Sequence, residues 1–466
     1  MKIKQLKIPF CIFLVVFGIY LAIGIPQHLH FGTNAYDFGI HDQAVWKYAH
    51  FQGFENTVMG FSNVLGDHFD PIMMLFAPVF WIWDDAKALL VAQALVVALG
   101  IFPAFFIAKR HLKNSFCAGL LSAAYGLSIG IISAIAYPVH DLALVGTFFL
   151  FAYDFLEKNK KVGYWTFIIL ALLCKENVSI MIAAFGLYLF VFRKGFRKTG
   201  LATFVLATLY FAAVMKFILP ALANHYNHWI YLNWGKDPLD VLKNILLRPI
   251  DFVRAFFDNP EKTQTLKYGL GSFAFLFLAA PSLLFVIVPI LAERFLSTKD
   301  TTWGVWFHYS APLMSVLFIA TVVGIKRIVQ ISSKFLKAEA VLVLLSFAVL
   351  FSGLIMNYHK QGPLVQLVNL KWDKMGEREK QLNEIIKSIP ADVSVSAQSD
   401  LLPHLSHRNK IYMFPNINNS EYVVLEKNGN TWPLVEKSYF ENVEKIKKTY
   451  RVCKENDYGV IYAKVR

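Results

Sequence analysis

Long apolar runs separated by short polar stretches dominate the first three quarters of the chain. A helix needs about 20 residues to cross a hydrocarbon core about 30 Å thick, and several runs approach that length. We expect membrane segments, four of them too short for a simple crossing, at residues 8–26, 71–83, 86–108, 115–136, 140–156, 163–174, 177–192, 200–220, 267–280, 282–292, 305–325 and 338–357. The pattern predicts an all-α polytopic membrane protein with roughly nine to twelve membrane segments, including short partial helices.

The pattern changes after about residue 358, where the chain becomes polar. An amphipathic helix is expected near residues 375–389. Alternating polar and apolar positions predict strands near residues 392–397, 411–414, 450–455 and 458–464. We therefore expect two domains, a transmembrane domain over residues 1–357 and a small C-terminal α/β domain over residues 358–466.

Lysine and arginine collect in the polar stretches of the membrane part, at residues 2–7, 109–113, 158–161, 193–198 and 326–327. Such clusters stay on the cytoplasmic side of a membrane. This rule places the N-terminus in the cytoplasm and three segments outside the membrane: the large first external loop, residues 27–85, an interfacial segment, residues 221–262, and the C-terminal domain. Residues 267–292, split by Pro281, are expected to form a hairpin that returns to the outer face. The first apolar run lacks a small-x-small cleavage site, which favours an uncleaved helix over a signal peptide.

The composition agrees with a membrane protein. Hydrophobic residues make up 56% of the chain and charged residues only 17%, whereas soluble domains are about 25% charged. The net charge of +14 would suggest a nucleic-acid partner in a soluble protein, but here it follows the topology, so we expect the lipid bilayer and no nucleic acid as a partner. Walker, dinucleotide, HExxH and GxSxG motifs are missing from the sequence, which gives nucleotide-driven and serine-hydrolase chemistry no support.

Acidic, histidine and lysine side chains occur in the stretches assigned to the outer face, namely Asp37, Asp42, Asp67, His68, Asp70, His140, Asp141, Lys175, Glu176, and His308 with Tyr309. A carboxylate at a water–lipid boundary can take a proton from an acceptor hydroxyl while the membrane presents a lipid-linked substrate. Asp37 and Asp42 are the candidate bases. Asp37, Asp42, Asp67 and His68 are also candidate ligands of a divalent cation, Mg²⁺ or Mn²⁺, although no spacing is diagnostic of a metal.

Structural interpretations remain open for the same residues. Asp37 and Asp141 can each cap a helix, and the first external loop can be a solvated connection with turns at residues 66–67 and 70–71. Lys175 and Glu176 can lie at the tip of a helix hairpin in headgroup water. The tail stretch 401–408 can form a surface turn instead of contacting a phosphate or a sugar.

Five motifs, in this order, resemble those of a known family: Tyr36–Trp46, Gly66–Pro71, Lys175–Asn177, His308–Pro312 and Val395–Arg408. The family is the group of predicted membrane proteins called domain of unknown function twenty seventy-nine. The chain is more distantly similar to the C-type (GT-C) membrane glycosyltransferases. In those enzymes an aspartate of the first external loop is generally the base or the acceptor-orienting group, and donors are usually sugars on polyprenyl phosphate.

The resemblance implies a GT-C-like helical bundle at the cell membrane. It implies inverting transfer of a sugar from a polyprenyl-phosphate-linked donor to a glycan, lipid or protein acceptor, with Asp37 or Asp42 as the base. Gln43 would hydrogen-bond a sugar, and Lys175, His308 or Arg254 would stabilise the leaving phosphate. Two other classes remain as alternatives, a non-enzymatic membrane scaffold and a transporter or flippase of a lipid or glycan.

Overall fold

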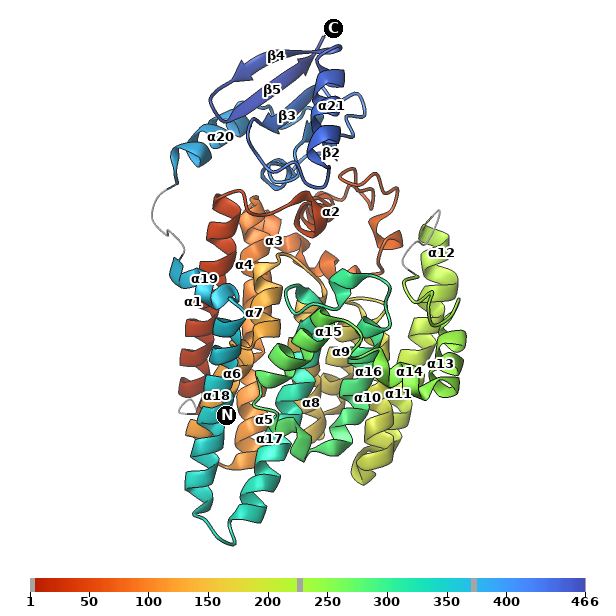
Figure 1. The fold of residues 1–466 in the computed structure, drawn as a ribbon, viewed down its shortest axis with the longest axis vertical. Helices are drawn as coiled ribbons and strands as arrows, with labels where there is room; N and C mark the ends of the chain where they lie inside the picture. Colours follow the sequence, from red (N-terminus) through yellow and green to blue (C-terminus); the bar gives the residue numbers. More distant parts are fainter. Residues whose placement is uncertain (1–4, 224–228, 370–374, 466) are drawn as a thin grey trace.

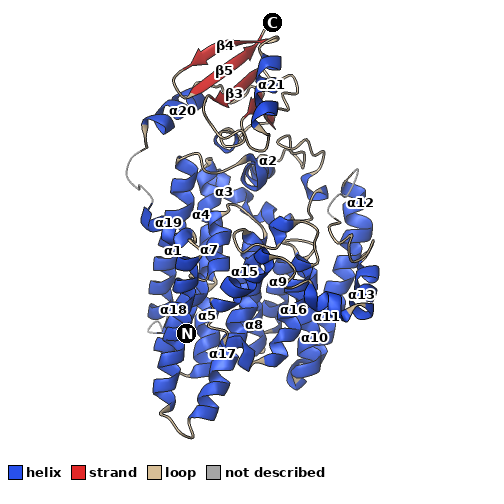
Figure 2. Ribbon diagram, viewed as in Figure 1, coloured by secondary structure: helices blue, strands red, loops and turns tan. Residues whose placement is uncertain are grey.

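The computed structural model describes residues 5–223, 229–369 and 375–465. It consists of a long helical bundle with a small α/β domain at one end (Figures 1 and 2). Within the described residues, five helices are long and apolar enough to cross a membrane, or six if one bent pair is a single span, and three shorter apolar helices accompany them. The predicted fold class, a helical membrane protein with a small C-terminal α/β domain, is confirmed.

The bundle helices are the apolar segments expected from the sequence. They are α1 (Lys7–Leu29), α4 (Ala86–Leu99), α5 (Ile101–Leu112), α6 (Ser115–Gly126), α7 (Ile129–Ala136), α8 (Leu142–Glu157), α9 (Lys161–Leu172), α10 (Val178–Phe192), α11 (Arg197–Ala213), α16 (Leu284–Phe295), α17 (Ala311–Ser332) and α18 (Ala338–His359). The central helix α17 is buried along most of its length, whereas only a third or less of α1, α11 and α18 is buried inside the protein. A helix that is apolar all round is buried in protein or faces lipid, so these three helices form the lipid-facing rim.

Residues 266–295 form the expected hairpin. The chain descends through irregular turns to a 3₁₀ turn, Leu276–Ala279, and returns as α16. At the far end from the C-terminal domain, Arg327 of α17 donates a hydrogen bond of 3.0 Å to the Ala279 carbonyl. A Cβ atom on Gly324 would lie only 2.2 Å from the Leu276 carbonyl oxygen. Non-helical backbone inside a membrane must be buried in protein or line a water-filled cavity. The irregular turns of the hairpin meet this requirement by packing their backbone directly against α17.

Short helices surround one end and one side of the bundle: α2 (Ile40–Ala49), α3 (Ala77–Ile82), α12 (Leu219–Leu222), α13 (Pro238–Leu247), α14 (Pro249–Arg254), α15 (Pro260–Thr265) and α19 (Pro363–Asn369). Of the expected interfacial segment 221–262, residues 224–228 lie outside the described part. Helices α13 and α14 expose Leu239, Leu246, Ile250 and Val253. Exposed apolar faces on short amphipathic helices are typical of a membrane interface.

The C-terminal domain contains one mixed five-stranded sheet in the order β2-β1-β3-β5-β4. Its elements are α20 (Glu377–Lys387), β1 (Val395–Ala397), β2 (Ile411–Met413), β3 (Tyr422–Glu426), α21 (Glu436–Ile446), β4 (Tyr450–Glu455) and β5 (Gly459–Lys464). Strand β1 pairs in parallel with β2 and β3, and β5 pairs antiparallel with β3 and β4. Helix α20 and four strands match the expected positions. Strand β3 and helix α21 were missed because asparagine-, glycine- and proline-rich turns break up residues 415–435.

The first external loop contributes to the core of the C-terminal domain. Phe31, Ala35 and Val58 of the loop belong to the same buried cluster as apolar residues of α20, β1 and β2. The Ala35 amide donates a hydrogen bond of 2.7 Å to the Ser399 carbonyl. The stretch 401–408 is mostly buried in this junction, so it is not the exposed surface turn that its polar sequence suggested. The loop and the C-terminal domain therefore share one core across the predicted domain boundary.

Candidate active site

Asp37 lies in the loop that leads into α2, in an unusual backbone conformation. Its φ and ψ angles are 59° and −73°, close to the rare and strained γ-turn conformation. Helix α2 begins at Ile40 and Gly39 is its N-cap, so Asp37 does not cap this helix. The Asp37 side chain remains 30% exposed, and its Oδ1 atom lies 4.0 Å from Nε2 of His140. Strain of this kind is concentrated at functional sites, so Asp37 is a natural starting point for the site.

Three histidines lie next to Asp37. The rings of His140 and His308 stack with centroids 3.3 Å apart, and His41 meets His140 edge-on at 5.5 Å. His41 lies 3.6 Å from Asp70. Burial lowers the pKa values of His41 and His140, and the charge of Lys175 lowers the His140 pKa further. Both nitrogen atoms of His308 are buried and lack a hydrogen-bond partner within the described residues. The site therefore contains three adjacent imidazole rings that can donate or accept hydrogen bonds.

The turn before α10 supplies two opposite charges. Glu176 accepts a hydrogen bond of 3.1 Å from the Phe69 amide, and its other oxygen lies 2.9 Å from His68 Nδ1. Burial alone would raise the pKa of Glu176, but His68 and Lys175 lower it to about 2. These contacts connect the first external loop to the turn before α10.

Lys175 is 6% exposed, and within the described part of the chain its ammonium makes no hydrogen bond or ion pair. Burial alone would lower the Lys175 pKa, but Asp141 and Glu176 raise it above its ordinary value. The lysine therefore stays charged although no carboxylate directly contacts it.

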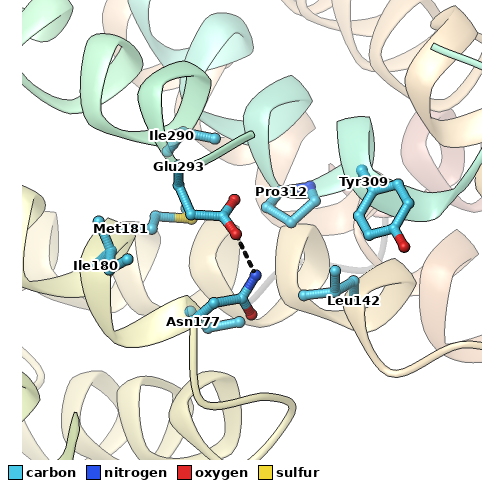
Figure 3. A pocket seen from close by; sticks show the side chains of 9 residues that line it. Leu142, Asn177, Ile180, Met181, Ile290, Glu293, Tyr309 and Pro312 are labelled. Carbon is cyan, nitrogen blue, oxygen red and sulfur yellow. Dashed lines mark hydrogen bonds between the residues drawn. The ribbon is translucent and has the colours of Figure 1, made fainter. Parts of the chain in front are cut away.

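Neighbouring cavities that share lining residues begin beside Tyr309. A small cavity of about 30 Å³ lies where Asn177 donates a hydrogen bond of 3.0 Å to Glu293 (Figure 3). It adjoins a polar cavity of about 90 Å³ lined by Lys175, Glu176 and Lys299. The polar cavity shares lining residues with an apolar cavity of about 440 Å³ between α11, α13 and α16. A charged compartment therefore opens directly into an apolar one.

Arg294 holds one wall of this site in place. Its buried guanidinium donates to the carbonyls of Thr302 and Gly304 and to the Ser310 hydroxyl, at 2.9, 2.7 and 3.0 Å. These bonds fix the loop that carries Lys299 and His308. The residues Asn177, Lys299, Glu293, Tyr231 and His41 were not among the predicted site residues. Glu293 and Arg294 follow an apolar run, and ionisable residues at such a position could have indicated this part of the site.

Several predicted residues converge on this site. Asp37, Asp70, His140, Lys175, Glu176 and His308 form the network described above, with His68 on Glu176 and Tyr309 lining the two smaller cavities. Asp67 follows the 3₁₀ turn Val64–Gly66, and its charge acts on Asp70. Asp141 pairs with His140 and also caps α8 through the Leu142 amide.

Asp42 and Gln43 bind the C-terminal domain instead. Asp42 is completely buried, hydrogen-bonded to the Ser406 hydroxyl and 3.2 Å from His407 Nε2. The Gln43 side-chain amide donates to the Thr57 hydroxyl and the Arg408 carbonyl, and its oxygen accepts from the Thr57 and Val58 amides. These hydrogen bonds leave no group for a sugar. Asp42 and Gln43 were expected in the site, but the structure places them at the junction with the C-terminal domain, where their side chains bind other protein groups.

Arg254 also lies apart from the network. Its guanidinium is 75% exposed on α14 and pairs with Asp251. In the described residues, no three histidine, cysteine or acidic side chains are arranged to hold a metal ion. The expected divalent-cation set fails this test because Asp42 is bound to His407 while Asp37 faces His140.

The family model described as "Predicted membrane protein (DUF2079)" matches residues 27–461. The chain belongs to the DUF2079 family. A search of curated proteins finds no match to this DUF2079 chain. Among solved structures, the chain is similar to that of ArnT from Cupriavidus metallidurans bound to undecaprenyl phosphate, with a TM-score of 0.58, 12% identity, and coverage of 100% of this chain and 99% of that chain. The DUF2079 chain therefore has a GT-C fold.

Proposed function

We propose that this protein is an integral-membrane glycosyltransferase that moves a sugar from a polyprenyl-phosphate-linked donor to an acceptor hydroxyl. In this proposal the N-terminus is cytoplasmic and Asp37 faces the outside of the cell membrane. Asp37 is the base, and Lys175 binds the phosphate.

The observation that carries the proposal is the buried side chain of Lys175, whose ammonium has no ion-pair partner among the described residues. Buried charges in membrane proteins are costly and normally paired. Lys175 instead lines the polar cavity without an ion-pair partner in the described residues. A phosphate group of a substrate would supply the missing partner, and Lys299 lines the same cavity as a second cation.

The adjoining apolar cavity suits the lipid part of such a donor. It is lined by Phe211, Leu242, Ile245 and Phe252 among others, and Glu293 lies at its junction with the polar cavity. Apolar chains gain about 0.8 kcal/mol for each buried CH₂ group. A polyprenyl chain in this cavity would place its phosphate at Lys175. ArnT, whose fold this chain shares, is bound to undecaprenyl phosphate, which supports this class of ligand.

Asp37 supports the transfer step because, of the two candidate bases, it is the one accessible to an acceptor. As the acceptor oxygen attacks the anomeric carbon, Asp37 takes the hydroxyl proton and the bond from that carbon to the phosphate oxygen breaks. The electron pair leaves with the phosphate, and Lys175 stabilises the developing negative charge.

A binding and transfer experiment tests the proposal. The full chain in nanodiscs is titrated with polyprenyl phosphate, and transfer is assayed with a panel of polyprenyl-phosphate sugars. Asp37→Asn is expected to lower turnover by on the order of 10²–10⁴-fold, as for loss of a general base, with lipid binding retained. Lys175→Met is expected to weaken lipid binding at least tenfold, since a hydrogen bond to a charged group contributes about 1.5–3 kcal/mol.

The exposed cation Arg254 provides the matched control, and Arg254→Met should bind lipid like the wild type. Equal turnover in the wild type and Asp37→Asn would remove the proposed base. Equal affinity in Lys175→Met and Arg254→Met would remove the proposed phosphate contact.

A further inference from the structure

A second cavity lies at the end of the bundle opposite the C-terminal domain. It has a volume of about 630 Å³ and lies between the α8–α9 turn and the α10–α11 turn. Five cations line it, Lys160, Lys161, Lys194, Arg197 and Lys198. The basic end cavity, as we call it, lies where α11 begins, and it shares no lining residue with the cavities of the candidate active site.

The five cations have no acidic partner in the part of the chain that the structure describes. Asp154 and Glu157, the acids near the end of α8, are already paired with Arg110, Lys158 and Arg193. The cavity therefore gathers positive charge that the protein does not neutralise. Such a concentration of charge attracts an anion.

Two helices begin at this cavity. Lys161 is the first residue of α9, and Arg197 is the first residue of α11. Neither helix has an acidic residue in its first turn or a side chain that caps its N-terminus. The positive end of the helix dipole favours an anion at such a position, in addition to the charge of the five cations.

An apolar surface continues from the cavity along both helices. Tyr164 of α9 and Thr203 of α11 are joined by a hydrogen bond of 2.5 Å. Trp165 and Ala202 line the cavity, and residues three or four positions further along a helix lie on the same face. One turn on, Ile169 is 47% exposed and Val205 is 44% exposed. These faces point to lipid, so a ligand with acyl chains beside its anionic group fits better than a free anion.

We propose that the basic end cavity binds the phosphate headgroup of an anionic phospholipid, whose acyl chains lie along α9 and α11. This site is separate from the proposed donor site and does not depend on glycosyl transfer. The lipid would contribute the negative charge that the α8–α9 and α10–α11 turns lack.

Thermal unfolding of the full chain in a neutral detergent tests this inference. Short-chain phosphatidylglycerol, short-chain phosphatidylcholine and inorganic phosphate are titrated separately. Phosphatidylglycerol is expected to raise the unfolding midpoint, and the other two are not. A triple variant, Lys160→Gln with Lys161→Gln and Lys198→Gln, is expected to bind phosphatidylglycerol on the order of 100-fold more weakly, at about 1 kcal/mol for each cation.

The control triple variant, Lys326→Gln with Lys334→Gln and Lys337→Gln, removes the same charge from the same end of the bundle and should bind like the wild type. Loss of binding in this control as well would overturn the proposal in favour of diffuse surface charge. An equal effect of inorganic phosphate would identify a soluble-anion site, and no effect of phosphatidylglycerol would exclude the site. If the first triple variant unfolds without lipid, Lys161→Gln alone takes its place, with an expected loss of about fivefold.

Discussion

Asp37 and Asp42 are five positions apart in the first external loop, yet their surroundings are opposite. Asp37 is partly exposed in a strained turn beside His140, whereas Asp42 is buried against Ser406 and His407. Solvent access decides which carboxylate can meet an acceptor hydroxyl. At the scale of single residues, Asp42 is therefore a structural group and Asp37 the candidate base.

Gln43 provides a test of this structural role. Replacing it in Gln43→Leu leaves the Thr57 amide and the Arg408 carbonyl buried without their partner. An unsatisfied buried polar group costs about 1–3 kcal/mol. The unfolding midpoint of the full chain should fall, and the exposed residue of the same segment serves as the control, since Gln52→Leu should leave the midpoint nearly unchanged. An unchanged midpoint in Gln43→Leu would contradict the assigned role.

The sequence could not separate these residues. Asp37 and Asp42 are both acidic residues of the same loop, and the expected cap role of Asp37 is wrong for α2, because this helix begins at Ile40 and Asp37 lies in the turn before it. Ser406 and Arg408, which bind Asp42 and Gln43 from the C-terminal domain, lie more than 360 positions away in the chain. The local sequence pattern carries no information about such contacts. Lys175 could be singled out because it interrupts an apolar stretch, where a charged side chain is costly and often functional.

Helices α10 and α11 pack closely against each other. A Cβ atom on Gly186 would lie 2.5 Å from the Phe204 amide nitrogen, and one on Gly200 would lie 2.6 Å from the Phe190 amide nitrogen. Small residues at such positions let helix backbones approach inside a membrane. This hairpin holds the basic turn 193–196 at one end and the Lys175–Glu176 turn near the other.

Gly186→Ala tests this packing at the scale of the element. The added methyl group meets backbone that cannot rotate away, and overpacking of this kind costs about 1–3 kcal/mol. The unfolding midpoint in detergent is expected to fall. Gly18→Ala in α1 is the control, because no atom lies within 4 Å of its added Cβ. The packing role would be excluded by equal midpoints in the two variants.

Most membrane helices could be placed from the sequence because apolar runs of their length have few alternatives. The hairpin at residues 266–295 was harder, since its path depends on Gly324 of α17 receiving the Leu276 backbone. Its return was inferred from the break at Pro281 and from the basic residues at 326–327. The elements that remained unassigned, β3 and α21, are short and stabilised by the sheet around them.

At the scale of the whole molecule, the bundle and the C-terminal domain are joined by a titratable contact. His407 lies 2.7 Å from Asp84 and 3.2 Å from Asp42. Burial alone would lower the pKa of His407, but Asp42 and Asp84 raise it to about 9. The charged form of His407 therefore stabilises the junction between the two parts.

This junction should weaken as the pH rises. Because the pKa of His407 is higher in the folded protein than in the unfolded chain, its protonation stabilises the folded protein by about 3 kcal/mol. This stabilisation is complete below the unfolded pKa of about 6.5 and is lost as the pH rises through the folded pKa of about 9. Limited proteolysis of the full chain should become faster from pH 6.5 to pH 9. In His407→Gln the rate should change little with pH, and a parallel increase in both proteins would contradict the assignment.

The shared core also sets an order of events during synthesis. Domains fold from the N-terminus as the chain emerges. The hydrogen bond from the Ala35 amide to Ser399 can form only after Ser399, which lies 364 residues later in the chain, has been made. The loop that carries Asp37 is thus held in shape only after the last fifth of the chain has joined it. A chain ending before α20 would retain Asp37, His140 and Lys175 and still lack the surface that fixes Asp37 in place. In the proposed mechanism, assembly of the C-terminal domain is therefore the step that fixes the base Asp37 in place.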